Sequence, residues 1–231
     1  SNILSAALGG AIFNLGNIIF VAALVLSGMS VAFPVGAGIG LILGVLLNYI
    51  AAPVGNGFYL FLGVALVATA ILLSARAYRN LSRKENNVSR KGIFLSVIAG
   101  VLFGFFYRFI AGAMTTDFGT PEPGKLEPYA AVVFFALGVF LSNIILNTIM
   151  MKKPVQGTAV TYNMYLKGMS KDHLMGILGG FIWGTGLVLS ILSTEQAGFA
   201  ISFGLGQGNA MIAATWGVSI RRDFAKAPAG T

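Results

Sequence analysis

The stretch LGGAIFNLGNIIFVAALVLSGMSVAFPVGAG, residues 8–38, decides the fold of this chain. It contains two long apolar runs on either side of a short GMS sequence, and it carries no charged residue. An α-helix needs about 20 apolar residues to cross the hydrocarbon core of a bilayer. The stretch therefore predicts two successive transmembrane helices.

Similar apolar runs continue along the rest of the chain. Hydrophobic residues make up 56% of the sequence and charged residues 10%, and the mean hydropathy of +0.84 is far above that of soluble domains. We expect an all-α polytopic membrane protein that forms a single integral domain over residues 1–231. The seven predicted spans are Leu4–Leu26, Ser30–Ile50, Phe58–Ala75, Gly92–Met114, Tyr129–Met151, His173–Ser193 and Gly198–Ile220.

The basic residues lie almost entirely on one side of these spans. They cluster in the loop 76–91, in the loop after the fifth span and in the tail after Ile220, while the opposite loops hold Lys125 and several acidic residues. The positive-inside rule makes the basic side cytoplasmic, so residue 1 lies outside and residue 231 in the cytoplasm, most simply of a bacterial plasma membrane. Because the charge of +8 sits in short loops, it does not indicate nucleic-acid binding.

An internal repeat relates the first two spans to the last two. A shift of 170 residues aligns residues 8–38 with LGGFIWGTGLVLSILSTEQAGFAISFGLGQG, residues 178–208, and Gly28 falls on Gly198. The copies cross the membrane in opposite directions, as in transporters built from inverted repeats. Residues 1–75 then form the remainder of one repeat, 76–91 a cytoplasmic basic loop, and 92–231 most of the other. This predicts ten helices in two sets of five, with two before Ser1 and one after Thr231.

Several short motifs resemble a known family. They are GGAIFNLGN (9–17), GMSVAFPV (28–35), LNYI (47–50), GGFIWGTG (179–186), GQGNA (206–210) and TWG (215–217). In this order they resemble the ureide permease branch of the drug/metabolite transporter superfamily, whose bacterial members include sugar, rhamnose and glucose-uptake carriers. The resemblance implies secondary transport of a small polar uncharged metabolite, such as a sugar, ureide or nucleobase. A multidrug or metabolite exporter of the same superfamily is the alternative within it.

Two asparagines on the first span are candidate substrate-binding residues. Asn14 and Asn17 lie three residues apart, on neighbouring helix faces. An unpaired amide in hydrocarbon costs several kcal/mol, so both side chains must face protein or a wet cavity. They either bond between helices or bind a polar uncharged ligand.

Three residues of the second copy complete the predicted site. Gln207 and Asn209 lie among glycines that allow close approach of a helix or ligand, and Trp183 occupies the repeat position of Phe13. Trp183 could stack on a planar or sugar ring. Polar groups from both copies are expected to converge on one cavity at the repeat interface. Asn48, Asn143 and Asn147 lie near span ends and are expected at the membrane interface.

The spans offer no group for catalysis. None has an Asp or Glu well inside it, the one histidine, His173, lies at a loop end, and the chain has no cysteine. We therefore expect no catalytic residue, no metal site and no cofactor, and a lipid-modifying enzyme is disfavoured. Arg108 either snorkels to the outer surface or acts as a charge in the pathway. The coupling ion, a proton or sodium, stays open, and a structural or signalling membrane subunit is the alternative from another class.

Overall fold

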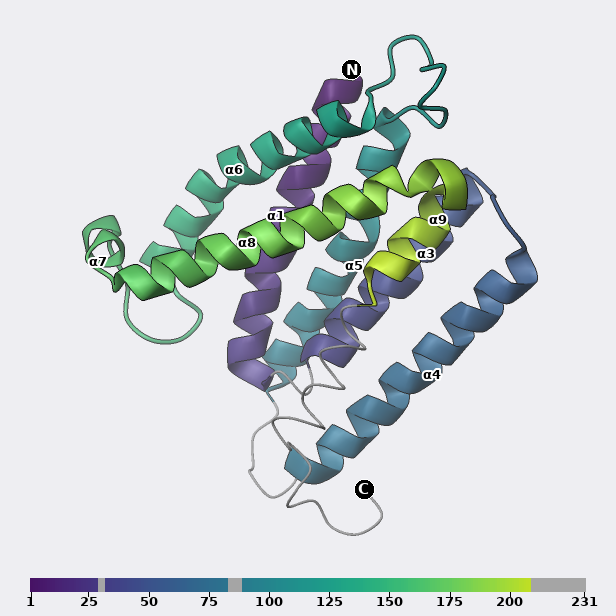
Figure 1. Ribbon diagram of the computed structural model, residues 1–231. Helices are drawn as coiled ribbons and strands as arrows, with labels where there is room; N and C mark the ends of the chain where they lie inside the picture. Colours follow the sequence, from purple (N-terminus) through teal and green to yellow (C-terminus); the bar gives the residue numbers. More distant parts are fainter. Residues whose placement is uncertain (29–31, 83–88, 209–231) are drawn as a thin grey trace.

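The structure is a computed structural model that describes residues 1–28, 32–82 and 89–208, and its regular elements there are helices (Figure 1). Asn2–Ser27 forms α1, and the π-helical turn η1 (Phe33–Ala37) continues into α3 (Gly38–Ala51). The other helices are α4 (Gly57–Ser82), α5 (Arg90–Ala113), α6 (Pro128–Lys152), α7 (Tyr162–Leu166), α8 (Ser170–Leu192) and α9 (Thr194–Gly206).

Length and apolar composition confirm the predicted class of fold. Within the described residues, α1, the continuous helix Phe33–Ala51, α5, α6 and α8 are each long and apolar enough to cross a membrane. The apolar part of α4, Gly57–Leu73, is shorter. The chain is thus an all-α polytopic membrane protein, while the total of seven or ten helices stays a prediction.

Successive helices connect at two opposite ends of the bundle. At one end, Asn2 Nδ2 donates a hydrogen bond to the Gly124 carbonyl oxygen (2.6 Å), which places the start of α1 beside the loop 114–127. We call this the acidic end because it gathers Asp117, Glu122, Glu127 and Glu195. We call the other the basic end because it gathers Lys152, Lys153, Lys167 and Lys171.

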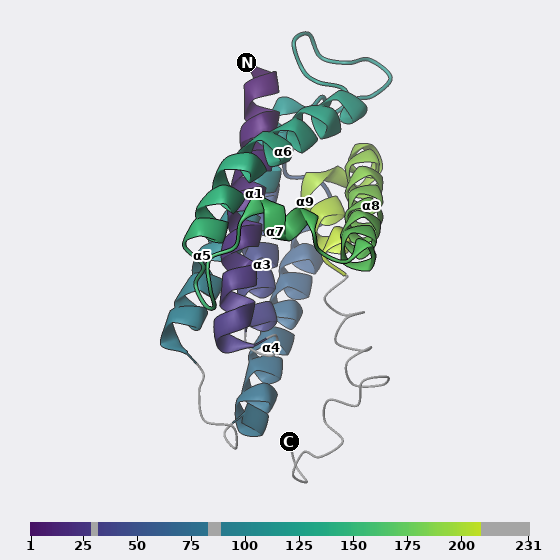
Figure 2. The ribbon, with the colours of Figure 1, turned by 90° about the vertical axis from the view of Figure 1, so that its left-hand side faces the viewer.

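Glycines bring α1, α3 and α5 into close contact. A Cβ atom added to Gly9 on α1 would lie 3.0 Å from the Phe106 carbonyl oxygen of α5, and one added to Gly104 of α5 would lie 3.3 Å from the Gly44 backbone nitrogen of α3. In lipid, burial of apolar surface contributes little to the association of helices. Small residues favour association there because they let the helix backbones pack closely. Figure 2 shows α9 lying between α8 and the layer formed by these three helices.

Two predicted boundaries differ from the structure. The basic loop was predicted over residues 76–91, but α4 stays helical to Ser82 and α5 already begins at Arg90. The physical reason is that arginine favours helix, and that the Ser89 side chain caps the first turn of α5 by accepting the Gly92 N–H. Residues beyond 208 of the span predicted over Gly198–Ile220 lie outside the described part. His173 lies in the first turn of α8 instead of a loop.

Gly28 and Gly198 have the same unusual backbone conformation. Their φ and ψ angles are 77° and 161° at Gly28, and 76° and 162° at Gly198. This region is open essentially to glycine alone. The two residues are the ones that the 170-residue shift aligns, and each separates the first helix of a copy from the second. Such agreement is what an internal repeat produces, although the repeat itself stays a prediction.

Hydrogen bonds to Asp117 hold part of the loop 114–127. The carboxylate accepts the Thr120 hydroxyl (2.6 Å) and the backbone N–H groups of Thr120 and Gly119 (3.0 and 2.8 Å). These bonds, that of the Thr120 hydroxyl first, lower the pKa of Asp117 below its usual value of 3.8. A carboxyl with a lowered folded pKa stabilises the fold at pH above its unfolded pKa, and that contribution is lost as pH falls through the folded pKa.

Replacement of Thr120 by alanine is therefore expected to raise the pKa of Asp117 back toward its usual value. Titration of the carboxyl ¹³C signals by NMR measures this shift. The matched control is Thr116→Ala, since the Thr116 hydroxyl bonds Glu122 and not Asp117, so that this variant should raise the pKa of Glu122 alone. An Asp117 pKa that is unchanged in Thr120→Ala contradicts this account of the loop.

Candidate functional site

The candidate site is a pocket between α1 and α6. The two helices touch near the acidic end, where Gly10 faces the Phe135 carbonyl oxygen and Gly138 faces the backbone of Ala7. From this contact α6 runs at a steep angle to α1 (Figure 1). A pocket of about 310 Å³ lies between the parts of these helices nearer the basic end, together with Pro154, Val155 and Gln156 of the following loop. This volume is at the lower end of the range for small-molecule sites, about 300 to 1,000 Å³.

Five side-chain amides line this pocket, which we call the amide pocket. They are Asn14, Asn17, Asn143, Asn147 and Gln156. The other residues lining it are apolar, and no charged side chain is among the described lining residues. We infer that the pocket suits an uncharged ligand with several hydrogen-bonding groups, because each amide offers two donors and one acceptor.

Asn14 is positioned by the neighbouring helix. Its Nδ2 donates to Ser142 Oγ on α6 (3.0 Å), and that hydroxyl in turn donates to the Val139 carbonyl oxygen (3.0 Å). Asn14 is buried, with 4% of its surface exposed, whereas Asn17 one turn further is exposed. Asn14 thus forms a hydrogen bond between helices, which is one of its two predicted roles, and it also borders the pocket. Asn17 is the more exposed of the two asparagines.

Two lining residues were missed by the sequence analysis. Asn143 and Asn147 were expected at the membrane interface because they lie near the end of the fifth span. They are four residues apart on α6 and so share one face, and this face borders the pocket. The spacing was the available signal, but only the position of α1 shows where the face points.

Trp183 and Gln207 lie apart from the amide pocket, since neither lines it. The Trp183 ring stacks on Phe13, with ring centroids 4.6 Å apart and an angle of 19° between planes. Gln207 follows α9, where its backbone N–H donates to Phe203 and Gly204 carbonyl oxygens (both 3.2 Å). Asn209 lies outside the described residues. The structure therefore joins Asn14 and Asn17 in one pocket, and does not bring Trp183 or Gln207 to it.

Arg108 extends along its own helix toward the acidic end. Its Nη1 atom would lie 3.0 Å from a Cβ added to Gly112, one turn further along α5. The side chain is partly buried and does not line the amide pocket. This direction is the one expected for snorkelling toward the nearer surface.

A bundle of membrane-spanning helices with an uncharged, amide-lined pocket has the features of a membrane transporter for small solutes. Over residues 1–224 the chain matches the family described as sugar transport protein, and it therefore belongs to that family. This confirms the resemblance to the sugar and ureide permease branch.

Two relatives from Arabidopsis thaliana are similar to part of the chain. Ureide permease 4 is 26% identical over 137 residues, and ureide permease 2 is 25% identical over 136 residues. Each match covers 58% of this chain and 34% of the relative, so it spans about a third of the relative's length. No solved structure matches the chain.

Proposed function

We propose that this chain binds and moves a small polar uncharged metabolite, such as a sugar, ureide or nucleobase, as part of a secondary transporter that works by alternating access. The observation that carries the proposal is the amide pocket, with five neutral hydrogen-bonding side chains and no charged one among its described lining. The family is described as sugar transport protein, and the relatives are named ureide permeases. Both names describe solutes of this chemistry.

The proposed architecture is an inverted repeat of two five-helix sets. The shared conformation of Gly28 and Gly198 supports it, and so does the stack of Phe13 on Trp183, because equivalent residues meet each other only near a symmetry axis. On α8, a Cβ added at Gly179 or Gly180 meets no described atom within 4 Å, whereas the equivalent residues of α1 are closely packed. We propose that this face of α8 packs against helices equivalent to α5 and α6.

The proposed orientation places the basic end in the cytoplasm of a bacterial plasma membrane, with residue 1 outside. The proposed ligands are the transported solute and a coupling proton or sodium ion, and the chain needs no cofactor for this role. Trp183, Gln207 and Asn209 remain proposed contributors to the solute path, and Arg108 a proposed charge near its outer end.

Replacement of Asn17 by alanine tests the proposed function. Loss of one or two hydrogen bonds to a neutral solute costs about 1 to 2 kcal/mol, so the apparent affinity is expected to fall about 5- to 30-fold. Asn143→Ala should have a similar effect from the opposite wall. The measurement is concentration-dependent uptake of radiolabelled allantoin and glucose by cells that express the intact protein, with and without an imposed proton gradient.

The matched control is Asn163→Ala, because Asn163 is exposed on α7 and does not line the pocket. It should transport like the wild-type protein. If both pocket variants keep wild-type affinity at equal expression, the amide pocket is not the solute site.

A further inference from the structure

Two buried polar atoms near the acidic end have no partner among the described residues. They are Asn48 Oδ1 and the Tyr107 hydroxyl oxygen, and each side chain is only 1% exposed. Asn48 Nδ2 donates to the Gly44 carbonyl oxygen (2.8 Å), which fixes Oδ1 as the free atom of the amide. A buried polar group without a partner costs about 1 to 3 kcal/mol and requires an explanation.

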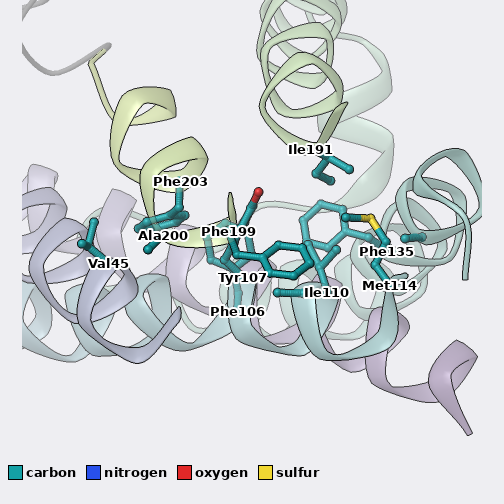
Figure 3. Close-up of a cluster of buried hydrophobic side chains, with 12 residues drawn as sticks. Val45, Phe106, Tyr107, Ile110, Met114, Phe135, Ile191, Phe199, Ala200 and Phe203 are labelled. Atoms are coloured by element: carbon teal, nitrogen blue, oxygen red, sulfur yellow. The ribbon is translucent and has the colours of Figure 1, made fainter. Parts of the chain in front are cut away.

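The nearest hydroxyl does not satisfy Tyr107. Ser190 lies beside the phenol, but its hydroxyl donates to the Ser202 carbonyl oxygen (3.0 Å), and the Tyr107 hydroxyl has no hydrogen-bond partner among the described residues. Tyr107 also belongs to a cluster of buried hydrophobic residues drawn from α3, α5, α6, α8 and α9 (Figure 3). Its hydroxyl could both donate to and accept from a ligand.

The helix register places Asn48 and Tyr107 on facing turns. Helices α3 and α5 run in the same direction. Gly36 of η1 lies against Gly100, Gly40 lies between Gly100 and Gly104, and Gly44 lies against Gly104. One turn beyond the pair of Gly44 and Gly104, Asn48 of α3 and Tyr107 of α5 are expected on facing turns near the acidic end.

The short helix α9 covers this location. The Phe203 ring packs onto Gly44, and its centroid lies 4.9 Å from that of Tyr107. Phe199 and Ala200 complete the cover from the same helix (Figure 3). All three follow Gly198, where the glycine-only conformation breaks the helix. Before the break, Glu195 Oε1 accepts the Phe118 N–H (2.9 Å), which anchors the α8–α9 turn to the loop 114–127.

We propose that Asn48 and Tyr107 form a second solute-binding site, which is filled when the part of α9 after Gly198 moves away from α3 and α5. This proposal rests on the proposed transport function. The ligand is an uncharged solute with a hydroxyl or N–H group that donates to Asn48 Oδ1, while the Tyr107 hydroxyl donates or accepts. In the described conformation α9 closes this site, and the amide pocket lies toward the opposite end, so the two sites serve opposite openings of one path.

The unpartnered atoms favour this binding role over a structural one. A packing residue at either position would be more stable without its free oxygen, since removal of an unsatisfied polar atom removes its desolvation cost. A binding residue keeps the atom because the ligand satisfies it during transport. Stability and transport are therefore expected to change in opposite directions when the oxygen is removed.

The first test is Tyr107→Phe in the intact protein, which removes a single oxygen atom. The ratio kcat/KM for uptake of radiolabelled allantoin or glucose is expected to fall about tenfold, the equivalent of one hydrogen bond to the solute. The melting temperature in detergent should stay constant or rise. The control is Tyr129→Phe, because Tyr129 is 64% exposed and the variant should change neither quantity. Asn48→Leu, which also removes a free oxygen, should behave like Tyr107→Phe.

Wild-type uptake by Tyr107→Phe would overturn the second site. If Asn17→Ala still impairs uptake in that case, the proposed transport function stands without a second site. A lowered melting temperature with a parallel loss of uptake would assign Tyr107 to packing and would also overturn the proposal. If Asn17→Ala and Tyr107→Phe both transport normally, both proposals fail.

The second test needs no knowledge of the solute. Since the chain has no cysteine, Ala200→Cys introduces a single thiol on the face of α9 that covers the site, where Ala200 is 2% exposed. A membrane-impermeant methanethiosulfonate reagent should modify it from the side of the acidic end about tenfold faster than it modifies Ala99→Cys, which is fully buried between packed helices. Equal slow rates for the two thiols would show that α9 does not open and would overturn the proposal.

Discussion

Replacement of Gly10 by valine is expected to separate α1 from α6 and to destabilise the bundle by about 3 kcal/mol or more. A Cβ atom at Gly10 would overlap the Phe135 carbonyl oxygen and would lie 2.8 Å from the Val139 backbone nitrogen. Both are backbone atoms of a helix, so no rotation of a side chain can relieve the contact. The amide pocket should be lost as well, because its two main walls are these helices.

The matched control for this prediction is Gly63→Val. Gly63 lies exposed on α4, and a Cβ added there meets no described atom within 4 Å. Unfolding in detergent with increasing urea, followed by circular dichroism, gives the free energy of each variant. A loss for Gly63→Val as large as that for Gly10→Val would contradict the contact seen between α1 and α6.

Replacement of Gly198 by alanine is expected to cost more than the same change at Gly28. At Gly28 the added Cβ meets no described atom within 4 Å, so the expected cost is the backbone strain of a glycine-only conformation, about 1 to 3 kcal/mol. At Gly198 the same strain is joined by a contact of 2.8 Å with Val54 Cβ, which adds about 1 to 3 kcal/mol.

The contribution of the contact can be isolated by a double variant. Val54→Gly removes the opposing Cβ, so it should restore part of the stability lost in Gly198→Ala and none of that lost in Gly28→Ala. The free energies of unfolding of the single and double variants give this coupling directly. Equal losses at the two glycines, without coupling to Val54, would show that the contact plays no part.

The helices could be predicted from sequence because lipid leaves few alternatives. A long apolar run must be helical to satisfy its own backbone polar groups, so composition and length locate spans such as Asn2–Ser27 to within a few residues. The end of α4 could not be located in this way. Its last turns carry basic residues, which end the apolar run although arginine favours helix, so hydropathy places the end of the span before the end of the helix.

The site could be predicted only in part, because it depends on which helix faces meet. Asn14 and Asn17 were recognisable, since amides near the middle of a span need partners. Asn48 was assigned to the interface by its distance from the span end, but α9 folds over that end and buries it. The α9 cover comes from a helix break at Gly198 that no hydropathy plot displays.

The stack of Phe13 on Trp183 bears on how such a chain could have arisen. If the repeat reflects the joining of two identical half-length subunits, a residue on the axis of the ancestral pair had only its own copy to contact, so any mutation there changed both partners at once. Fusion into one polypeptide frees the two positions to vary separately. A Phe–Trp stack is a combination that no exact homodimer can contain at its axis. If such a fusion took place, the contact marks a gain in evolutionary freedom, because each half could then be adjusted without altering the other.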